Sequence, residues 1–340
     1  MRLFSRGLLP APPLHRFPAG ALMPPAWHGS DPSLCYFFNP SIATHAGERI
    51  MAYRVVLPDK RRRMAVCRLD RGWQIVPESI VPLSDLVIDG GHWHGDPRFC
   101  SFGDRLLLHF NSGGAAPNDI FLVELDPATL RPLGPCRTVA LDHPRSPVEK
   151  NWMFFAHDHS LYTVYSIAPH RVHRVRLEGT GPVRCESAYN TPWDSSAVTS
   201  RFGAPRGSTP PVRIGDRFHS FFHTRHRRPF HRRLLGAIRG LPLRGLAYGT
   251  GVYTFRAQPP FMPESCSPGP LFEPPLRRPS PRPPLAPWTD SNIYASGAVH
   301  DGDEWVVSAG MHDDGCALMR LRHVDVLGAM QAIEPAGSFR

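Results

Sequence analysis

One acidic residue introduces an apolar stretch of the chain. Asp96 lies in the run Gly95-Asp96-Pro97-Arg98, directly before residues 99–102, which read as a short strand. The carboxyl group of Asp96 and the guanidinium of Arg98 stand where a turn leads into an apolar strand, which makes them candidates for a functional site. Asp and Gly are also ordinary turn residues, so a purely structural role stays open. The elements around Asp96 must decide between the two.

The same layout occurs about five times along the chain. Each copy has a polar start, a short strand, a small turn and a longer apolar strand. The other copies begin at Asn39-Pro40-Ser41, Glu149-Lys150-Asn151-Trp152, Ser208-Thr209-Pro210 and Tyr294-Ala295-Ser296. Four short strands cannot bury both faces of one sheet, and radial stacking of repeats of roughly 40 to 60 residues solves this. We therefore predict an all-β fold, a five-bladed β-propeller.

In a propeller the innermost strands line a central channel, which gathers polar residues from different blades. The starts of four inner strands are expected at one mouth: Asn39, Asp96, Lys150 and Ser208. The second strands of three blades are expected to end near the same mouth, at Arg54, His223 and Asp313. Because neighbouring strand residues alternate in direction, Lys150 is expected to face the channel, with Glu149 and Asn151 on the other side.

The domain organisation follows from where proline gathers. Residues 1–33 are expected to form a proline-rich N-terminal arm, and residues 34–335 a single propeller domain. A second proline-rich segment, residues 258–287, is predicted to be an extended crossing before the last blade. Residues 324–333 are predicted to end the fold with a short helix.

Charge points to an anionic partner. The chain of 340 residues has 39 Lys and Arg against 29 Asp and Glu, a formal net charge of +10. Phosphate, a nucleotide sugar or an acidic glycan would gain from that field, although a coding bias toward Arg and Pro would give the same balance. The densest basic run, residues 225–233, includes only one aromatic residue, Phe230, so a nucleic-acid site is not expected.

The cysteines and the absence of long apolar runs favour a cytoplasmic protein. Seven cysteines are scattered along the chain and none forms a Cys-x-x-Cys pair, which favours a reducing compartment over a disulfide framework. No apolar run reaches membrane-spanning length, and the apolar part of the N-terminus is too short and proline-broken for a signal peptide.

The segment before Asp96 holds two further candidates. His92, His94 and Asp96 could converge on one side of an extended chain, but no second ligand set accompanies them, so no metal site is predicted. Trp93 could stack on a sugar ring or simply pack against the protein.

The order of these motifs resembles glycoside hydrolase family 130. The matching runs extend from Asn39-Pro40-Ser41 and Ala52-Tyr53-Arg54 through Asp96-Pro97-Arg98 and Glu149-Lys150-Asn151-Trp152 to Gly207-Ser208-Thr209, Phe222-His223 and Gly310-Met311-His312-Asp313. The resemblance covers roughly residues 34–321. It implies a five-bladed propeller that phosphorolyses or hydrolyses β-mannosides, with mannosyltransferase relatives of the same architecture. The Glu-Lys-Asn-Trp version resembles a less characterised bacterial branch.

The resemblance also implies roles for individual residues. Asp96 matches the general acid, which passes its proton through a sugar hydroxyl while an anion or water attacks with inversion. Arg54, Lys150 and His223 match phosphate ligands, and Asn39 and Asp313 match sugar ligands. Further substrate-binding candidates are Ser41, Arg98, Asn151 and Ser208. Gly95 stands where the family has an acidic residue, and a further arginine of a phosphate clamp would be Arg171, Arg201 or Arg206.

Three functions remain open on this basis. The first is an enzyme that breaks or makes a β-mannoside-type bond by phosphorolysis or hydrolysis. It needs no cofactor, only an oligosaccharide or glycoside substrate and, for phosphorolysis, inorganic phosphate as a co-substrate. The second is a glycosyltransferase that uses a nucleotide sugar such as GDP-mannose. The third is a carbohydrate-binding propeller without catalysis.

Overall fold

A computed structural model describes most of the chain. It covers residues 8–113, 117–227, 246–272 and 289–333, together with single residues 234, 238, 283 and 285. The described residues are nearly all in strands and their connections, so the prediction of an all-β fold is confirmed.

Most strands follow the repeats in chain order. The first three groups are β2 (Tyr36–His45), β3 (Glu48–Val56) and β4 (Arg62–Leu69); β5 (Gly95–Phe102), β6 (Arg105–Asn111), β7 (Ile120–Leu125) and β8 (Arg137–Leu141); and β9 (Met153–His157), β10 (Ser160–Ser166), β11 (His170–Arg176) and β12 (Val183–Thr191). The later strands are β13 (Arg206–Gly207), β14 (Val212–Ile214), β15 (Arg217–Arg227), β16 (Leu246–Arg256), β17 (Pro263–Cys266) and β18 (Thr289–Ser291), then β19 (Ile293–Asp301), β20 (Glu304–Met311), β21 (Gly315–Arg322) and β22 (Gln331–Ala332).

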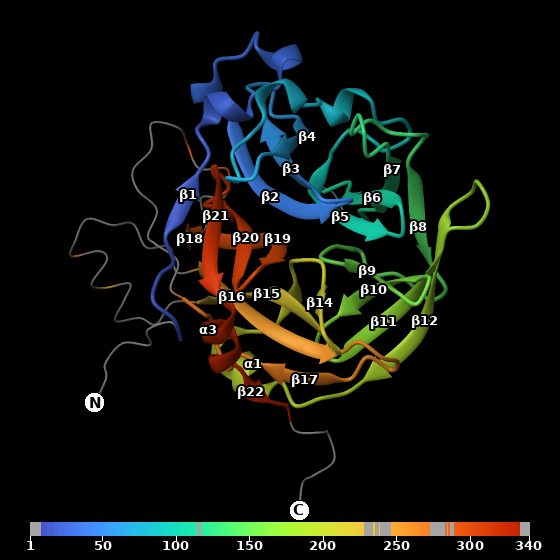
Figure 1. Ribbon diagram of the computed structural model, residues 1–340, viewed down its shortest axis with the longest axis vertical. Coiled ribbons are helices and arrows are strands. Elements are labelled where there is room, and N and C mark those ends of the chain that lie inside the picture. Colours follow the sequence, from blue (N-terminus) through green and yellow to red (C-terminus); the bar gives the residue numbers. More distant parts are fainter. Residues whose placement is uncertain are drawn as a thin grey trace, which may run out of the picture.

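The strands form four hydrogen-bonded sheets around a common centre (Figure 1). One sheet is β2-β3-β4, one contains β19-β20-β21, and one is built on β15 and β16. The eight-stranded sheet consists of two antiparallel runs, β5 to β8 and β9 to β12, which join through a parallel pairing of β8 with β12. Among the first strands, β2 contacts both β5 and β19, and β5 contacts β9.

Each repeat contains the tight hairpin that the sequence predicts. The pairs that close the five hairpins are His45 with Glu48, Phe102 with Arg105, His157 with Ser160, Ile214 with Arg217 and Asp301 with Glu304. Two residues lie between the members of each pair, and several of these turn positions have positive φ, including Gly103, Gly215 and Gly302. Glycine adopts that conformation without a steric penalty, so the Gly-Asp pairs of the sequence are turns.

Alternate residues of a strand serve different hydrophobic cores. In β3, Met51, Tyr53 and Val55 pack with β20 and β21, whereas Ile50 and Ala52 pack with β5, β6 and β7. Successive side chains point to opposite faces of a sheet, so strands that are buried on both faces are apolar almost throughout. The same division links each neighbouring pair of strand groups, and the last group packs on the first.

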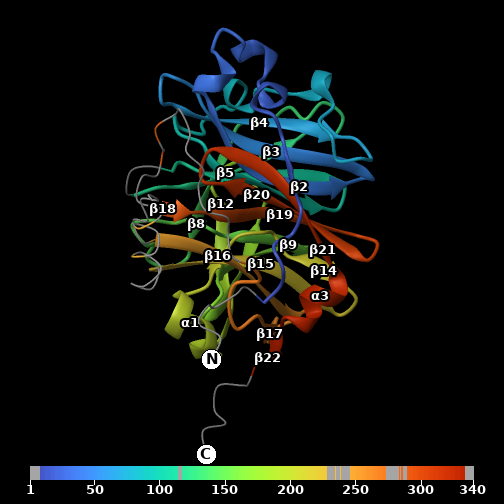
Figure 2. The same ribbon diagram turned by 90° about the vertical axis from the view of Figure 1, so that its left-hand side faces the viewer.

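The segment before β2 packs on the sheets. Strand β1 (Leu14–Arg16) pairs antiparallel with β21, at the edge of the last sheet (Figures 1 and 2). Three 3-10 helices follow, at Ala19–Leu22, Pro25–Trp27 and Pro32–Leu34. Phe17, Leu22 and Trp27 are buried in the core shared by β3, β4 and β21. Residues 14–27 therefore contribute to that core, while the domain boundary at residue 34 stays a prediction.

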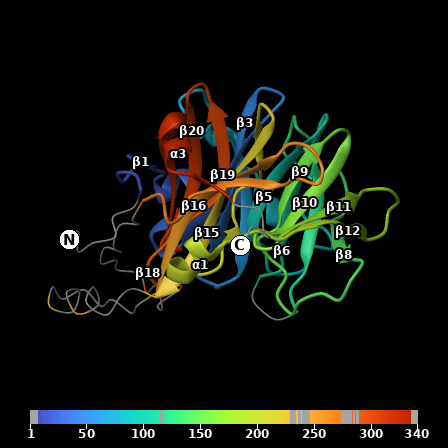
Figure 3. The same ribbon diagram turned by 90° about the horizontal axis from the view of Figure 1, so that it is seen from below.

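The proline-rich segment 258–287 is not only a crossing. Residues 263–266 form β17, which pairs with β16, so an extended connection is the wrong description for them; residues 273–282 lie outside the described part of the chain. The C-terminal helix is α3 (His323–Gly328), and a second helix, α1 (Ser196–Phe202), was not predicted. Figures 2 and 3 show α1 and α3 toward opposite faces of the molecule. Two further 3-10 helices are Pro77–Ser79 and Leu83–Asp85. Within the described residues no helix is both long and apolar enough to span a membrane.

Candidate active site

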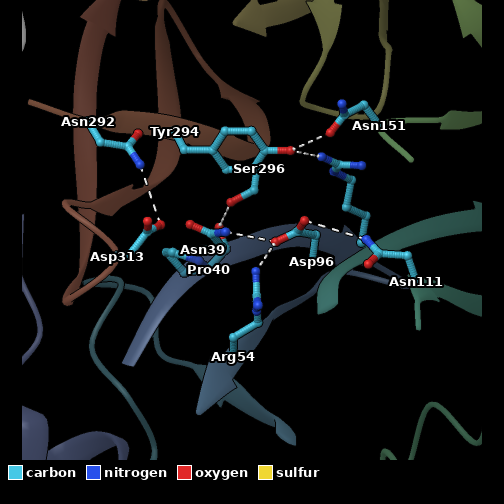
Figure 4. Close-up of polar contacts among 11 residues, drawn as sticks. Asn39, Pro40, Arg54, Asp96, Asn111, Asn151, Asn292, Tyr294, Ser296 and Asp313 are labelled. Atoms are coloured by element: carbon cyan, nitrogen blue, oxygen red, sulfur yellow. Dashed lines mark hydrogen bonds and ion pairs between the residues drawn. The ribbon is translucent and has the colours of Figure 1, made fainter. Parts of the chain in front are cut away.

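Asp96 lies at the start of β5, where the strand bulges. The hydrogen-bond register shifts between Gly95 and Arg98, and the backbone of Asp96 is left-handed, with φ +50°. Asn39 has φ +51° beside a similar register shift in β2. Asp and Asn tolerate this conformation better than most residues, and a bulge changes the direction of a side chain. The two side chains meet, and Asn39 Nδ2 donates a hydrogen bond of 2.7 Å to Asp96 Oδ1 (Figure 4).

Arg54 supplies the closest positive charge to Asp96. Its NH1 atom donates to Asp96 Oδ1 at 2.8 Å, and the side chains of Arg54 and Asp96 are only 7% and 16% exposed. The guanidinium lies 4.6 Å from the centroid of the Phe38 ring. Its Nε and NH2 atoms are buried and make no hydrogen bond to any residue that the structure describes. Arg54 thus binds Asp96 through NH1, and its Nε and NH2 groups could donate to an acceptor on a ligand.

The charge state of Asp96 follows from these contacts. Burial favours the neutral acid, but the charges of Arg54 and Arg98 and the hydrogen bonds from Asn39 and Arg54 outweigh it, and they hold the pKa of Asp96 well below its usual range. Asp96 is therefore a carboxylate at neutral pH. In this state it accepts hydrogen bonds and cannot donate a proton.

Arg98 joins the neighbourhood of Asp96 to two other segments of the chain. Its side chain is buried, and NH1 donates to the carbonyl of Trp152 at 3.3 Å while NH2 donates to the hydroxyl of Tyr294. That hydroxyl in turn donates to Asn151 Oδ1 at 3.1 Å (Figure 4). Burial, the largest cause, raises the pKa of Tyr294, so its hydroxyl keeps the proton that this hydrogen bond needs. The network links β5, β19 and the segment before β9.

His223 lies among cations. Its Nδ1 is hydrogen-bonded to Ser208 Oγ at 2.8 Å, and its ring packs against Tyr294 and Tyr248. Burial lowers the pKa of His223 to about 3, with further lowering from the charges of Arg98, Arg206 and Lys150 and a small opposing effect of Asp96. The imidazole is neutral at physiological pH, and the charges that act on it place Asp96 and Lys150 in the same neighbourhood.

The expected alternation around Lys150 is wrong. Asn151 has φ +66° and lies outside the strands, so directions do not alternate there as in a strand. Asn151 faces Tyr294, and Lys150 is exposed. Glu149 is buried and turns away from both: it accepts from the backbone N–H of Ser146 and from the side chains of Trp152 and Tyr165.

Asp313 faces the site from the last strand group. Its backbone is left-handed, with φ +54°, and its Oδ1 accepts a hydrogen bond of 3.4 Å from Asn292 Nδ2 (Figure 4). The charge of Asp313 acts on Arg62 and Tyr248, and the charge of Asp96 acts on the same two groups. Asp313 lies just beyond β20 (Glu304–Met311), and its assignment to the same site as Asp96 stays a prediction. Ser41 is different: it is fully buried in β2, and its Oγ makes no hydrogen bond to a described residue.

Two site residues were missed by the sequence reasoning. Asn111 ends β6 and approaches Asp96 Oδ2 at 3.5 Å; counting the hairpin register back from Gly103 would have placed it opposite Asp96 within one residue. Tyr294 was seen only as the start of a repeat. Asn111 also explains Gly95, because a Cβ at position 95 would lie 2.7 Å from Asn111 Oδ1. The space that an acidic side chain would need is filled.

The histidines before Asp96 do not form a ligand set. His94 is buried, with Nδ1 hydrogen-bonded to Ser84 Oγ at 2.6 Å and Nε2 to the carbonyl of Gly91 at 3.2 Å. Both ring nitrogens are therefore engaged within the loop. No group of three or more His, Cys, Asp or Glu side chains that could hold a metal ion occurs in the described part of the chain.

A large cavity lies away from these residues. It has a volume of about 990 Å³ and is lined by the far ends of the inner strands, at residues such as Thr44, Ser101, Ala156 and Asp301. None of the polar residues grouped around Asp96 lines it. We place the candidate active site at Asp96, because convergent charged and polar groups from several strand groups are a stronger sign of chemistry than cavity size.

Comparisons with known proteins bear on the fold. No family model matches the sequence, and no curated protein matches it. Solved structures do match. One, described by the words "The GH130 family of mannoside phosphorylases contains glycoside hydrolases that target beta-1,2 mannosidic linkages in Candida mannan", has 11% sequence identity, covers 95% of this chain and 96% of its own, and gives a TM-score of 0.60.

Two further structures agree with it. The β-1,2-mannobiose phosphorylase from Listeria innocua, in complex with β-1,2-mannobiose, has 14% identity, coverage of 93% and 98%, and a TM-score of 0.55. MPT-4, a mannose phosphorylase from Leishmania mexicana in complex with phosphate, has 11% identity, coverage of 89% and 88%, and a TM-score of 0.51. At this identity the likeness establishes the fold, which is that of the GH130 mannoside phosphorylases.

Proposed function

We propose that this protein is an enzyme that cleaves or forms a β-mannoside-type glycosidic bond with inversion, and that inorganic phosphate is the attacking group. The fold is that of proteins described as mannoside phosphorylases, one bound to β-1,2-mannobiose and one to phosphate. The observation that carries the proposal is the set of cations around Asp96 and His223. Arg54 contacts Asp96, and Arg206 is the register partner of His223. Besides burial, the charges of Arg98, Arg206 and Lys150 lower the pKa of His223. A neutral sugar does not need such a field, and a phosphate dianion does.

Phosphate would be held by Arg54, Lys150, His223 and Arg206. Arg54 has two buried donors without a partner among the described residues, and neutral His223 can donate an N–H. Arg206 is the register partner of His223 across β13 and β15. Of the other arginines considered for the clamp, Arg171 lies near Tyr165 and His173, and Arg201 stacks on Phe202 at 5.6 Å. Arg206 is therefore our choice.

Asp96 supplies the proton in this proposal. Phosphate attacks the anomeric carbon, the glycosidic C–O bond breaks, and the leaving oxygen takes a proton that Asp96 delivers through a sugar hydroxyl. Over the whole reaction the proton comes from hydrogen phosphate, which loses it on becoming the phosphate ester. Because Asp96 is a carboxylate in the free site, it must gain that proton when the ligands bind. Phosphate beside Arg54 has this effect, since its negative charge offsets the guanidinium that lowers the pKa of Asp96. Asn39 and Asp313 bind sugar hydroxyls.

Hydrolysis and transfer fit the site less well. Hydrolysis needs a second carboxylate as base for water, and Glu149 faces away from the site. Asp313 is the remaining acidic side chain that we group with Asp96, and we assign it to sugar binding. No observation favours a nucleotide sugar, so a glycosyltransferase is not part of the proposal.

The finer architecture belongs to the same proposal. We count five blades, supported by the five hairpins and by five shared cores that link each strand group to the next and the last to the first. The Glu-Lys-Asn-Trp branch, the cytoplasmic location and the need for no cofactor stay predictions. All seven cysteines are free and buried.

The test is turnover of a panel of β-linked mannobioses with and without phosphate. We expect mannose 1-phosphate to be released only with phosphate, and Asp96→Asn to lower kcat by roughly 10²- to 10⁴-fold. Asp301→Asn, at the far end of β19, is the matched control and should keep wild-type turnover. Release of free mannose without phosphate would mean hydrolysis. No turnover would leave the binding propeller or a transferase, and GDP-mannose would be offered next.

A further inference from the structure

Arg62 is a charged residue beside the site that the proposed reaction does not use. It is the first residue of β4 and pairs with Val56, while Arg54 pairs with Met64. Arg54 and Arg62 are thus diagonal neighbours on adjacent strands, and such residues share one face of the sheet. Burial and the charge of Arg54 lower the pKa of Arg62 to about 10, against the opposing effects of Asp96 and Asp313. Arg62 is therefore still charged at neutral pH.

The guanidinium of Arg62 has no acceptor of its own in the described part of the chain. No hydrogen bond or ion pair joins it to another residue there, and its contact is with the ring of Trp93, 4.9 Å from the centroid. Other arginines of the same region are paired: Arg54 with Asp96, and Arg63 with Asp59. A half-buried cation without an acceptor is unfavourable, and an added oxyanion would remove that cost.

Trp93 lies beside the start of β4, against Arg62. Its side chain is large and apolar, yet the residue is 38% exposed. The next residue, His94, is buried, donates its backbone N–H to the carbonyl of Arg62 at 3.4 Å, and is hydrogen-bonded to Ser84. These contacts hold the backbone next to Trp93 at the start of β4, and the indole itself contacts the Arg62 guanidinium. An exposed aromatic ring held beside a polar site is a platform for a sugar ring.

We propose that Arg62 and Trp93 form a subsite for an acidic sugar, in which Arg62 pairs with an oxyanion carried by the ring and Trp93 packs against the ring itself. The oxyanion is a carboxylate or a phosphate ester. This sugar is the one that leaves when the bond is cleaved, so the inference rests on the proposed function. It adds a substrate class, a mannoside of an acidic sugar.

The experiment measures binding by the full-length protein, so it does not depend on turnover. Calorimetric titrations compare glucuronic acid, glucose 6-phosphate and glucose in phosphate-free buffer at neutral pH. We expect at least one acidic sugar to bind roughly tenfold more tightly than glucose, as for one charge-assisted hydrogen-bonded pair. The acidic sugar that binds more tightly than glucose shows whether the oxyanion is a carboxylate or a phosphate ester. Arg62→Gln should remove the gain and leave the affinity for glucose unchanged, whereas Arg61→Gln, an exposed neighbour, should keep the gain.

Three outcomes would overturn the inference. If both acidic sugars bind like glucose, the subsite does not select for charge, and the proposed function still stands. If inorganic phosphate binds wild type and loses affinity in Arg62→Gln by the same factor, Arg62 belongs to the site of the free anion. If none of the three sugars binds, the acidic-sugar subsite is refuted, whereas the proposed function is decided separately by the turnover of the mannobioses. Trp93→Ala should weaken the binding of every sugar that binds to wild type. Unchanged affinities would show that Trp93 does not pack against the sugar ring.

Discussion

At the scale of residues, the site depends on backbone conformations that most side chains avoid. Asn39, Asp96 and Asn151 stand at or near the starts of inner strands, and all three have positive φ. These backbone conformations cost free energy, and they persist only where contacts with the surrounding structure hold them in place. Here Gly310 allows the arrangement, since a Cβ at that position would lie 2.1 Å from Asn39 Oδ1. The result is a set of short polar side chains aimed at one place.

The Arg54–Asp96 pair can be tested directly. Burial raises the pKa of Asp96, and the charge of Arg54 lowers it. Replacing Arg54 by Gln removes that charge, so the pKa of Asp96 should rise. The measurement is a titration of the Asp96 carboxyl carbon by NMR. Arg49→Gln is the matched control, because Arg49 lies on the same strand and also pairs with an aspartate, Asp301, at 2.9 Å. An equal Asp96 titration in wild type and Arg54→Gln would contradict our account of the carboxylate.

At the scale of elements, the segment before β2 behaves as part of the fold. Strand β1 covers the edge of β21, and an uncovered edge would offer unpaired backbone groups to other chains. Phe17 follows β1 directly, is 7% exposed, and enters the core between the first and last strand groups. The sequence analysis predicted a separate arm here because the segment is rich in proline, so these contacts were not expected.

Phe17→Ala tests that packing. We expect the free energy of unfolding to fall by about 3–5 kcal/mol, since a large aromatic side chain is lost from a filled core. Urea denaturation followed by circular dichroism gives the value. Leu34→Ala, at a residue that is 55% exposed, should change it by less than about 0.5 kcal/mol. Equal effects of the two substitutions would show that Phe17 does not pack as described.

At the scale of the whole molecule, buried histidines make stability depend on pH. Burial is the chief cause that lowers the pKa of His109, His170 and His223 to about 3 and of His173 and His219 to about 4. An unfolded histidine has a pKa near 6.5. The folded protein therefore binds fewer protons than the unfolded chain below that pH, and stability is lost as the pH falls from about 6.5 toward 4.

We expect the melting temperature to fall by on the order of 10 °C between pH 7.5 and pH 5. His219→Phe should make this fall smaller. Neither ring nitrogen of His219 has a hydrogen-bond partner among the residues with described positions, and its ring packs beside Trp305, so phenylalanine suits the space. The charged and titratable groups around it are His300, His323 and Arg217. A melting temperature independent of pH would refute the prediction.

The sequence by itself determined the repeating elements. Gly-Asp turns between apolar runs specify hairpins through local backbone preferences, and strands that are apolar on both faces need sheets on both sides. These are local properties, so the all-β fold and the five hairpins could be predicted. Candidate site residues could be chosen from the same pattern. The repeat is predicted to place Asp96 at the start of an inner strand, and Arg54, His223 and Asp313 near the ends of second strands at the same mouth.

The tertiary structure alone decided how the chosen side chains act. The bulges at Asp96 and Asn39 and the left-handed backbone of Asn151 break the alternation from which their directions would be read. Arg54 and Asp96 pair although they are 42 residues apart in the sequence. Arg98 and Tyr294 are hydrogen-bonded although 196 residues separate them. Charge interactions and burial depend on such contacts between distant residues. The protonation state of Asp96 and the contact of Arg62 with Trp93 therefore became visible only in three dimensions.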